Sequence, residues 1–283
     1  MLLHIRHETL YRYDRPVRHS VQSLRLTPRA DAGQRVQSWQ LVAPGKQAQQ
    51  LDAHGNVMHL LTIDEPHHEI QILVSGIVET DVKAVTGSVS TLSPLVYLPE
   101  TSLTRADDAL RAFASNSGTG RDRGAVTKLA SRVRDALDYE TGATAVFDTA
   151  AHAFALGRGV CQDHAHVMIA CSRVLGLPAR YVSGYVLTDR EDHVASHAWV
   201  DVWLEAEKQW CSVDVTNGML AGPQHCRLAV GRDYLDCCPV RGVRRGGGAE
   251  SMSAKVEVFE GSGPRRVTAP RPRLLQQRDA QQQ

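Results

Sequence analysis

The stretch GRGVCQDHAHVMIACSRVLGLPARYVSGYVL, residues 157–187, predicts a glycine turn, a helix and a buried strand in that order. Gly157 and Gly159 allow a sharp change of chain direction just before Cys161. The sequence Gly-Leu-Pro at residues 176–178 is typical of a helix end. The apolar residues between these points have helical spacing: Val167, Met168, Ala170, Cys171, Val174 and Leu175. Cys161 is therefore expected in the first turn of a helix.

A cysteine at a helix N-terminus is well placed for chemistry. The unpaired amides and the helix dipole stabilise an anion there, which favours the reactive thiolate. The same amides can stabilise the oxyanion of a tetrahedral intermediate. Without partners, however, a cysteine at a helix start is more often a small buried residue than a nucleophile. Cys171, well inside the same helix, is expected to be such a core residue.

Two later stretches supply the partners that a thiolate nucleophile needs. SHAWVDVWL alternates like a strand and carries His197, and WCSVDVTNG alternates in the same way and carries Asp214. On neighbouring strands, the Asp214 carboxylate can orient the imidazole of His197 toward Cys161. Asp201 is a weaker candidate for this role, because four residues of strand place it more than about 10 Å from His197.

Composition sets the broad class of protein. The chain has 283 residues and a formal net charge of +1, which gives no electrostatic reason to expect a nucleic-acid or membrane partner. The first residues, MLLHIRHETLYRYD, lack the apolar run of a signal peptide, and no later stretch is long enough to span a bilayer. We therefore expect a cytoplasmic protein whose six cysteines are free thiols.

The patterns along the chain indicate three regions. Residues 1–100 show short alternating segments separated by turn signals such as Arg15-Pro16, which predicts a β-sandwich-like domain. Residues 101–260 combine amphipathic helices with the strands described above. The expected helices are 106–114 and 125–139, with a shorter one within 149–156. Residues 261–283 are rich in Pro, Arg and Gln without periodicity and are expected to be disordered.

Several motifs resemble a known family. GVCQDHAH, LGLPARYVSGY, SHAWVDVWL and WCSVDVTNG are similar to the signatures of bacterial transglutaminase-like proteins, within the papain-like cysteine enzyme superfamily. HETLYRYDRPV, SLRLTPR and the DAHGN turn resemble the β-rich N-terminal domain that accompanies this core. The resemblance covers most of residues 1–260 and implies an α+β fold, in which a helix packs on an antiparallel sheet. One departure is Val215, because the family usually has proline after the residue that matches Asp214.

The resemblance also implies a reaction. By position, Cys161 matches the family's nucleophile, His197 its acid/base and Asp214 the residue that orients the imidazole. Cys161 would attack a carboxamide of a protein or peptide substrate, of the glutamine type, and release ammonia. An amine (transglutaminase) or water (cysteine peptidase or amidase) would then resolve the thioester. The sequence does not separate these two outcomes, because they differ in how well the pocket excludes water.

Four further residues are candidates for substrate contact. Gln162, beside the nucleophile, is expected either to donate its amide hydrogen to the oxyanion or to cap the helix. His164, one helical turn after the cysteine, is expected to line the pocket near the thiol. Tyr185, on the strand that follows the helix, and Trp199, on the strand that carries the histidine, are expected in the pocket wall or the core.

Metal binding is one alternative to thiol chemistry. The possible ligands are Cys161, Asp163, His164, His166, His193 and His197. Compact zinc patterns such as HExxH and CxxC are absent from the sequence. The TDREDH segment at 188–193 lacks the spaced oxygen ligands and the glycine of a calcium loop. We therefore expect neither a metal nor another cofactor.

The other alternative is a binding or scaffold module that keeps the fold without the reaction. The complete set of Cys161, His197 and Asp214 argues against it. Labelling by iodoacetamide separates the two, because a nucleophilic Cys161 should react near neutral pH much faster than Cys171 or Cys211.

Overall fold

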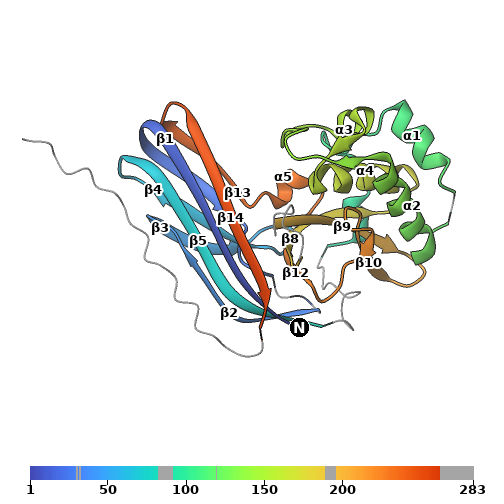
Figure 1. Cartoon of the computed structure of the whole chain (residues 1–283), viewed down its shortest axis with the longest axis horizontal. Helices are drawn as coiled ribbons and strands as arrows, with labels where there is room; N and C mark the ends of the chain where they lie inside the picture. The colour runs from blue at the N-terminus through green and yellow to red at the C-terminus, as the bar shows by residue number, and fades with distance from the viewer. Residues whose placement is uncertain (30, 32, 82–91, 119, 189–195, 262–283) are drawn as a thin grey trace, which may run out of the picture.

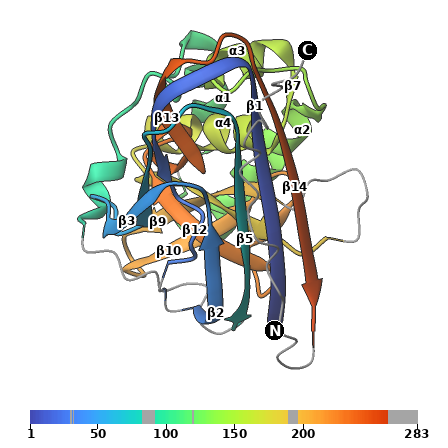
Figure 2. The ribbon, with the colours of Figure 1, turned by 90° about the vertical axis from the view of Figure 1, so that its left-hand side faces the viewer.

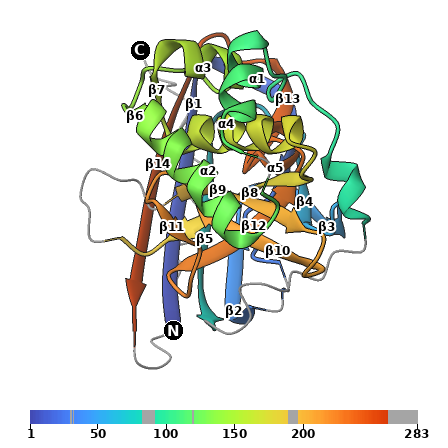
Figure 3. The same cartoon turned by 90° about the vertical axis from the view of Figure 1, so that its right-hand side faces the viewer.

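The computed structural model describes residues 1–29, 31, 33–81, 92–118, 120–188 and 196–261. It combines a curved β-sheet with an α+β core that lies beside it (Figure 1). Seen from one side, the curved sheet faces the viewer (Figure 2), and from the opposite side the helices of the core do so (Figure 3). The fold class is α+β, as predicted.

In the described part of the chain, seven strands form the curved sheet. Their bounds are β1 Leu2–Leu24, β2 Gln34–Val42, β3 Lys46–Leu51, β4 Val57–Ile63, β5 His67–Thr80, β13 Val240–Gly246 and β14 Glu250–Glu260. The order is β2-β5-β1-β4-β3, and β13 and β14 also pair with β1. All seven strands belong to one sheet that curves on itself. The β-rich character is as predicted, but the two stacked sheets of a sandwich are replaced by this single curved sheet.

Strand β1 is longer than the sequence pattern indicates. The sequence predicts a turn at Arg15-Pro16, but β1 continues through this point, and its register against β5 shifts between Arg12 and Val17. Because Pro16 has no N–H to donate, an irregularity in the pairing accommodates it. The two halves of β1 have different neighbours as a result: the first pairs with β5 and β14, and the second with β4 and β13.

The chain returns to this sheet near its C-terminal end. Strands β13 and β14 both run antiparallel to β1. Residues 240–260, which the sequence analysis assigns to the core region 101–260, thus complete the sheet begun by residues 1–100. An alternating segment such as KVEVFE predicts a strand but not the sheet that it joins, because strand pairing is a long-range contact. The predicted tail, from residue 262 onward, lies outside the described residues.

The core is built around helix α4. Its longer elements are α1 Asp108–Ser115, α2 Arg123–Ala136, α3 Ala150–Leu156, α4 Cys161–Val174, β8 Ala179–Val186, β9 Ser196–Leu204, β10 Gln209–Asp214 and β12 His225–Gly231. Shorter elements are η2 Pro94–Tyr97, β6 Asp138–Tyr139, β7 Arg158–Gly159, β11 Met219–Leu220 and α5 Tyr234–Cys237. None of the described helices has the length and apolar character needed to cross a membrane.

Helix α4 is buried from Gln162 to Arg173. Helices α1, α2 and α3 pack against it, and so do strands β8 and β9 of the core sheet. This sheet has the order β11-β10-β9-β8-β12, with antiparallel neighbours throughout. The predicted arrangement of the cysteine helix on an antiparallel sheet is therefore present.

The curved sheet and the core share an interface. Its apolar part consists of Leu3, Ile5, Val78, Tyr185, Cys226 and Leu228. Two side-chain amides from the curved sheet add polar contacts to β12. Asn56 exchanges two hydrogen bonds of 2.8 Å with the backbone of Val230, and Gln34 exchanges bonds of 2.7 and 2.8 Å with the backbone of Arg227. An edge strand of the core sheet is thereby covered by the N-terminal part of the chain.

Candidate active site

Two glycines of the opening stretch determine where α4 starts. Gly157 ends α3 in the left-handed conformation, with φ of 69°, which glycine adopts without strain. A Cβ on Gly159 would lie 2.5 Å from Oδ2 of Asp163, so a side chain there would displace this carboxylate. Asp163 accepts hydrogen bonds from the backbone N–H of Val160 at 2.8 Å and from Oγ1 of Thr144 at 2.7 Å. The carboxylate thus fixes the chain just before the helix.

Cys161 is the first residue of α4, as predicted. The amides of Asp163 and His164 donate to the carbonyl of Val160. The amides of Cys161 and Gln162 come before this first turn of helical hydrogen bonds and point toward the helix N-terminus. Amides in this position can stabilise an anion that forms next to the cysteine.

Cys161 differs from the other cysteines in its exposure. All six are free thiols, and Cys161 is half-buried whereas the other five are buried. Burial raises the pKa of Cys171 to about 12 and that of Cys211 to about 11. Because the thiolate is the nucleophile, buried thiols that stay protonated react poorly. Of the six thiols, Cys161 alone is placed to react.

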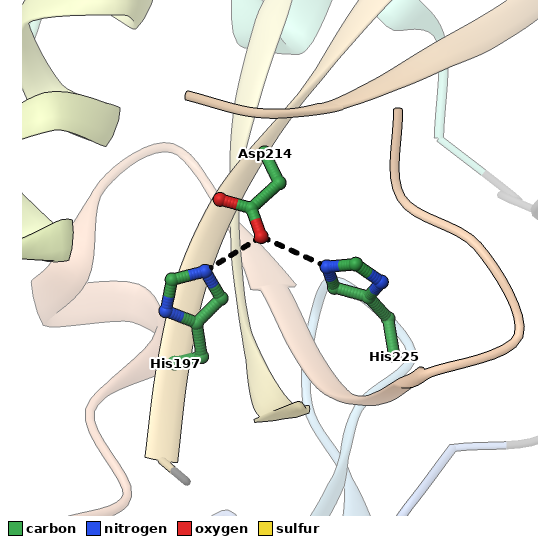
Figure 4. Close-up of side chains that lie close together, drawn as sticks. All are labelled: His197, Asp214 and His225. Carbon is green, nitrogen blue, oxygen red and sulfur yellow. Dashed lines mark hydrogen bonds and ion pairs between the residues drawn. The ribbon is translucent and has the colours of Figure 1, made fainter. Parts of the chain in front are cut away.

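His197 and Asp214 lie on the neighbouring strands β9 and β10, as the alternating patterns predict. Nε2 of His197 lies 2.8 Å from Oδ2 of Asp214 (Figure 4). This leaves the other ring nitrogen of His197 free of Asp214, and Cys161 lies close enough to His197 to raise the pKa of the imidazole. Asp201, the competing partner, instead bonds to Arg180 at 2.9 Å within the core. The predicted cysteine, histidine and aspartate therefore lie close together, with a hydrogen bond between the histidine and the aspartate.

The contact between His197 and Asp214 is shielded from solvent, with exposed fractions of 6% and 0%. Burial alone would lower the pKa of His197, but the hydrogen bonds with Asp214 and Cys161 outweigh it and raise this pKa to about 10. Burial alone would also raise the pKa of Asp214, but hydrogen bonds from His197 and His225 hold it far below its usual range. Both shifts favour an imidazolium beside a carboxylate.

Sequence analysis missed two residues that also bind Asp214. Asn217 donates from Nδ2 to Oδ2 at 2.7 Å and from its backbone N–H to Oδ1 at 3.1 Å. His225, the first residue of β12, places Nε2 2.9 Å from the same Oδ2 (Figure 4). The D-x-x-N spacing in WCSVDVTNG was a signal for Asn217, because an aspartate often accepts from the backbone shortly after it. The sequence contains no comparable signal for His225.

Gln162 and His164 flank the start of α4 but already have structural partners. The side-chain amide of Gln162 donates to the carbonyl of Val146 at 3.0 Å, so it anchors a neighbouring loop. His164 places Nε2 3.2 Å from the carbonyl of Leu137 and Nδ1 2.9 Å from Oγ1 of Thr216. Burial lowers the pKa of His164 to about 4, which keeps the ring neutral. The predicted roles of these two residues in substrate contact are not visible in this arrangement.

The structure places Tyr185 and Trp199 in the core, which is one of the two predicted positions. Tyr185 is fully buried, and its hydroxyl lies 2.9 Å from Nδ1 of His7 in the curved sheet. Trp199 is 1% exposed, and its ring centroid lies 6.3 Å from that of His197 and 5.1 Å from that of His225. Neither side chain offers surface to a substrate. Tyr185 is covered by apolar residues of β1 and β5. Trp199 packs against Val182, Ala221 and Val230 within the core.

The metal alternative can be tested against the chemistry of the site. Among the described residues, one group of three has ligand atoms within 4.8 Å of one another, namely His197, Asp214 and His225. Both imidazoles turn Nε2 toward the carboxylate, and Nδ1 of His225 accepts from the backbone N–H of Gly222 at 3.0 Å. This contact keeps the proton of His225 on Nε2, where a metal would need a lone pair. His193 and its acidic neighbours lie outside the described residues.

Comparisons with known proteins agree with this architecture. Two family models match the chain: the bacterial transglutaminase-like N-terminal region at residues 3–79 and the transglutaminase-like superfamily at residues 111–215. An uncharacterized protein of Mycobacterium leprae (strain TN) is 32% identical over 276 residues, which cover 89% of this chain and 96% of that protein. An uncharacterized protein of Mycobacterium tuberculosis (strain ATCC 25618 / H37Rv) is 31% identical over 293 residues, with coverages of 91% and 93%.

The fold also occurs in a solved structure. A candidate cysteine protease from Cytophaga hutchinsonii has a TM-score of 0.73 with this chain at 18% identity, over 93% of this chain and 92% of that one. At this identity the likeness supports the fold alone. The matched regions coincide with most of the curved sheet and with the core from α1 to the end of β10. The chain belongs to the transglutaminase-like superfamily and carries the N-terminal region found in its bacterial members.

Proposed function

We propose that the protein catalyses thiol-dependent acyl transfer at carboxamide or peptide bonds. The observation that carries this proposal is the buried pair of His197 and Asp214, joined at 2.8 Å, with the thiol of Cys161 close enough to the imidazole to raise its pKa. It combines a nucleophile at a helix N-terminus, a proton carrier and an acid that orients the carrier. The neighbouring cysteines are buried and offer no second nucleophile.

In the first half of the reaction, the sulfur of Cys161 attacks the carbonyl carbon, forming a C–S bond and placing negative charge on the oxygen. The amides at the start of α4 stabilise this oxyanion. The intermediate then collapses with cleavage of the C–N bond, and His197 gives its proton to the departing amine. The products are a thioester on Cys161 and ammonia, or an amine in the case of a peptide bond.

In the second half, an amine or water attacks the thioester. His197 takes the proton of the attacking group, the C–S bond breaks and the thiolate is restored. The same three residues serve both acceptors, so the site is compatible with a transglutaminase and with a peptidase or amidase. A protein or peptide substrate, which the family resemblance implies, and a cytoplasmic location are part of the proposal.

The experiment incubates the purified protein with a glutamine-containing peptide, with and without a primary amine. Mass spectrometry follows ammonia release, amine incorporation and backbone cleavage. We expect at least one of these products from the wild type and none from Cys161→Ala. Cys171→Ala is the matched control, because it removes a thiol from the same helix away from the site and should leave the products unchanged. Products that persist in Cys161→Ala would contradict the mechanism.

A wild type that forms no product with any peptide or amine tested, although its thiol reacts, would favour the binding-module alternative. Incorporation without cleavage would identify amine transfer, and deamidation or cleavage would identify hydrolysis. These outcomes separate the function classes that the sequence leaves open.

A further inference from the structure

A second histidine contacts the candidate acid of the site. His225 and His197 place their Nε2 atoms 2.9 and 2.8 Å from the same oxygen, Oδ2 of Asp214 (Figure 4). All three side chains are buried, with exposed fractions of 6%, 6% and 0%. His225 comes from β12, which is not adjacent to β9 or β10 in the sheet. It therefore approaches the carboxylate from a different direction than His197.

The hydrogen bonds of His225 determine its tautomer. The backbone N–H of Gly222 donates to Nδ1 at 3.0 Å, so Nδ1 must carry a lone pair and the ring proton lies on Nε2. This proton points at Asp214. A second proton on Nδ1 would face the N–H of Gly222 and break that bond. His225 is thus built as a neutral donor, and the positive charge beside the carboxylate belongs to His197.

The position of His225 is supported from two sides. On one side, the ring of Trp199 packs edge-on against it, at 5.1 Å between centroids. On the other, the amides of Asn56 and Gln34 bind the backbone of β12 from the curved sheet. The N-terminal part of the chain therefore takes part in fixing the strand that delivers the imidazole.

We propose that His225 is a positioning residue: it holds Oδ2 of Asp214 opposite His197, and β12 connects this function to the N-terminal sheet. The inference rests on the proposed acyl-transfer function. The side-chain hydrogen bonds of His225 go to Asp214 and to the backbone of Gly222, so its influence on the reaction passes through Asp214. Its loss should consequently change the rate of the chemical step and leave substrate binding unchanged.

Two variants at this position form a matched pair. His225→Leu fills the volume without a donor, whereas His225→Gln can present an amide N–H near the position of Nε2. We expect His225→Leu to lower kcat by roughly 10- to 100-fold, the usual effect of losing a hydrogen bond to a charged group, with KM within about twofold of wild type. We expect His225→Gln to recover most of the lost kcat. An unchanged kcat in His225→Leu, or a loss confined to KM, would overturn the proposal.

Equal losses in the two variants, with unfolding midpoints like that of wild type, would also overturn it, because a purely structural role is not rescued by an amide donor. Should His225→Leu fail to fold, the wild type itself provides the test. Ring nitrogen NMR of the histidines is expected to show His225 as the neutral Nε2–H tautomer and His197 as doubly protonated at neutral pH. An Nδ1–H tautomer at His225 would refute the assignment.

The rate of Cys161 alkylation by iodoacetamide separates this proposal from the proposed function. If no substrate is turned over but His225→Leu slows alkylation at least about fivefold and His225→Gln restores it, His225 positions the site and the acyl-transfer function is wrong. If alkylation is the same in all three proteins, the positioning role is wrong whatever the activity of the wild type.

Discussion

Replacing Gly159 with alanine tests how the start of α4 is built. A Cβ at this position would lie 2.5 Å from Oδ2 of Asp163 and 2.7 Å from its Cβ and Cγ. Asp163 cannot move aside freely, because it is 1% exposed and its carboxylate is bound by the backbone of Val160 and by Thr144. The alanine should therefore displace the carboxylate and shift the first turn of the helix.

The magnitude follows from the two hydrogen bonds that this displacement breaks. A hydrogen bond to a charged group contributes about 1.5–3 kcal/mol, so the loss of both costs about 3–6 kcal/mol. The smaller entropy of the unfolded chain after a Gly→Ala change returns about 0.4–1 kcal/mol. We expect Gly159→Ala to lower the free energy of unfolding by about 2–5.5 kcal/mol, which is a large part of the stability of a typical domain.

Urea unfolding followed by circular dichroism measures this change, and iodoacetamide labelling measures the effect on Cys161. Gly124→Ala is the control, because its Cβ would lie 3.4 Å from the nearest atom and the residue is in helix α2. That variant should be neutral or more stable by up to about 1 kcal/mol. The same unfolding midpoint in Gly159→Ala and wild type, with an unchanged labelling rate, would refute the reasoning.

Three further predictions concern buried polar groups. Burial lowers the pKa of His7 and His164 to about 4, whereas the unfolded chain binds these protons near pH 6.5. Protonation of each of these histidines in the unfolded chain therefore lowers the free energy of unfolding by up to about 1.4 kcal/mol per pH unit as the pH falls from 6.5 toward 4. A urea midpoint that stays constant over this range would contradict this pH dependence. Asn56→Ala breaks four side-chain hydrogen bonds, two with the backbone of β12 and one each with Arg29 and Asp52, and should cost about 2–6 kcal/mol in urea unfolding. A wild-type midpoint would show that these bonds do not hold the strand. Asp201→Asn leaves the buried Arg180 without the charge that lies 2.8 Å from its guanidinium and should cost about 3–5 kcal/mol, seen as a lower thermal midpoint; a higher midpoint would count against the ion pair as a stabilising contact.

Local patterns predicted the helix and strands that carry the three reacting residues. The glycines before Cys161 and the residues that end the helix are local signals, so the sequence placed Cys161 in the first turn of a helix, and α4 begins at this residue. The alternation around His197 and Asp214 identified two strands, which the structure pairs with each other. The aspartate and histidine meet because both strands are short and adjacent in the sequence.

Contacts between distant segments could not be predicted in this way. His225 reaches Asp214 only because β12 joins the sheet beside β8, and Tyr185 is buried because β1 and β5 cover that strand. A period of two in the sequence shows which residues share a face but not what covers the face. The return of residues 240–260 to β1 is a pairing of the same long-range kind.

Whether His197 and Asp214 activate Cys161 is decided by the alkylation rate of each cysteine at neutral pH, compared between wild type and His197→Gln by peptide mass mapping. Exposure alone already favours Cys161 over the five buried thiols, so the dependence on His197 decides the question. If His197 and Asp214 activate the thiol, Cys161 is the first cysteine to be labelled in the wild type. Its labelling rate is then at least about tenfold lower in His197→Gln, while the rates of the other cysteines are unchanged. A Cys161 rate that is the same in both proteins would contradict the account.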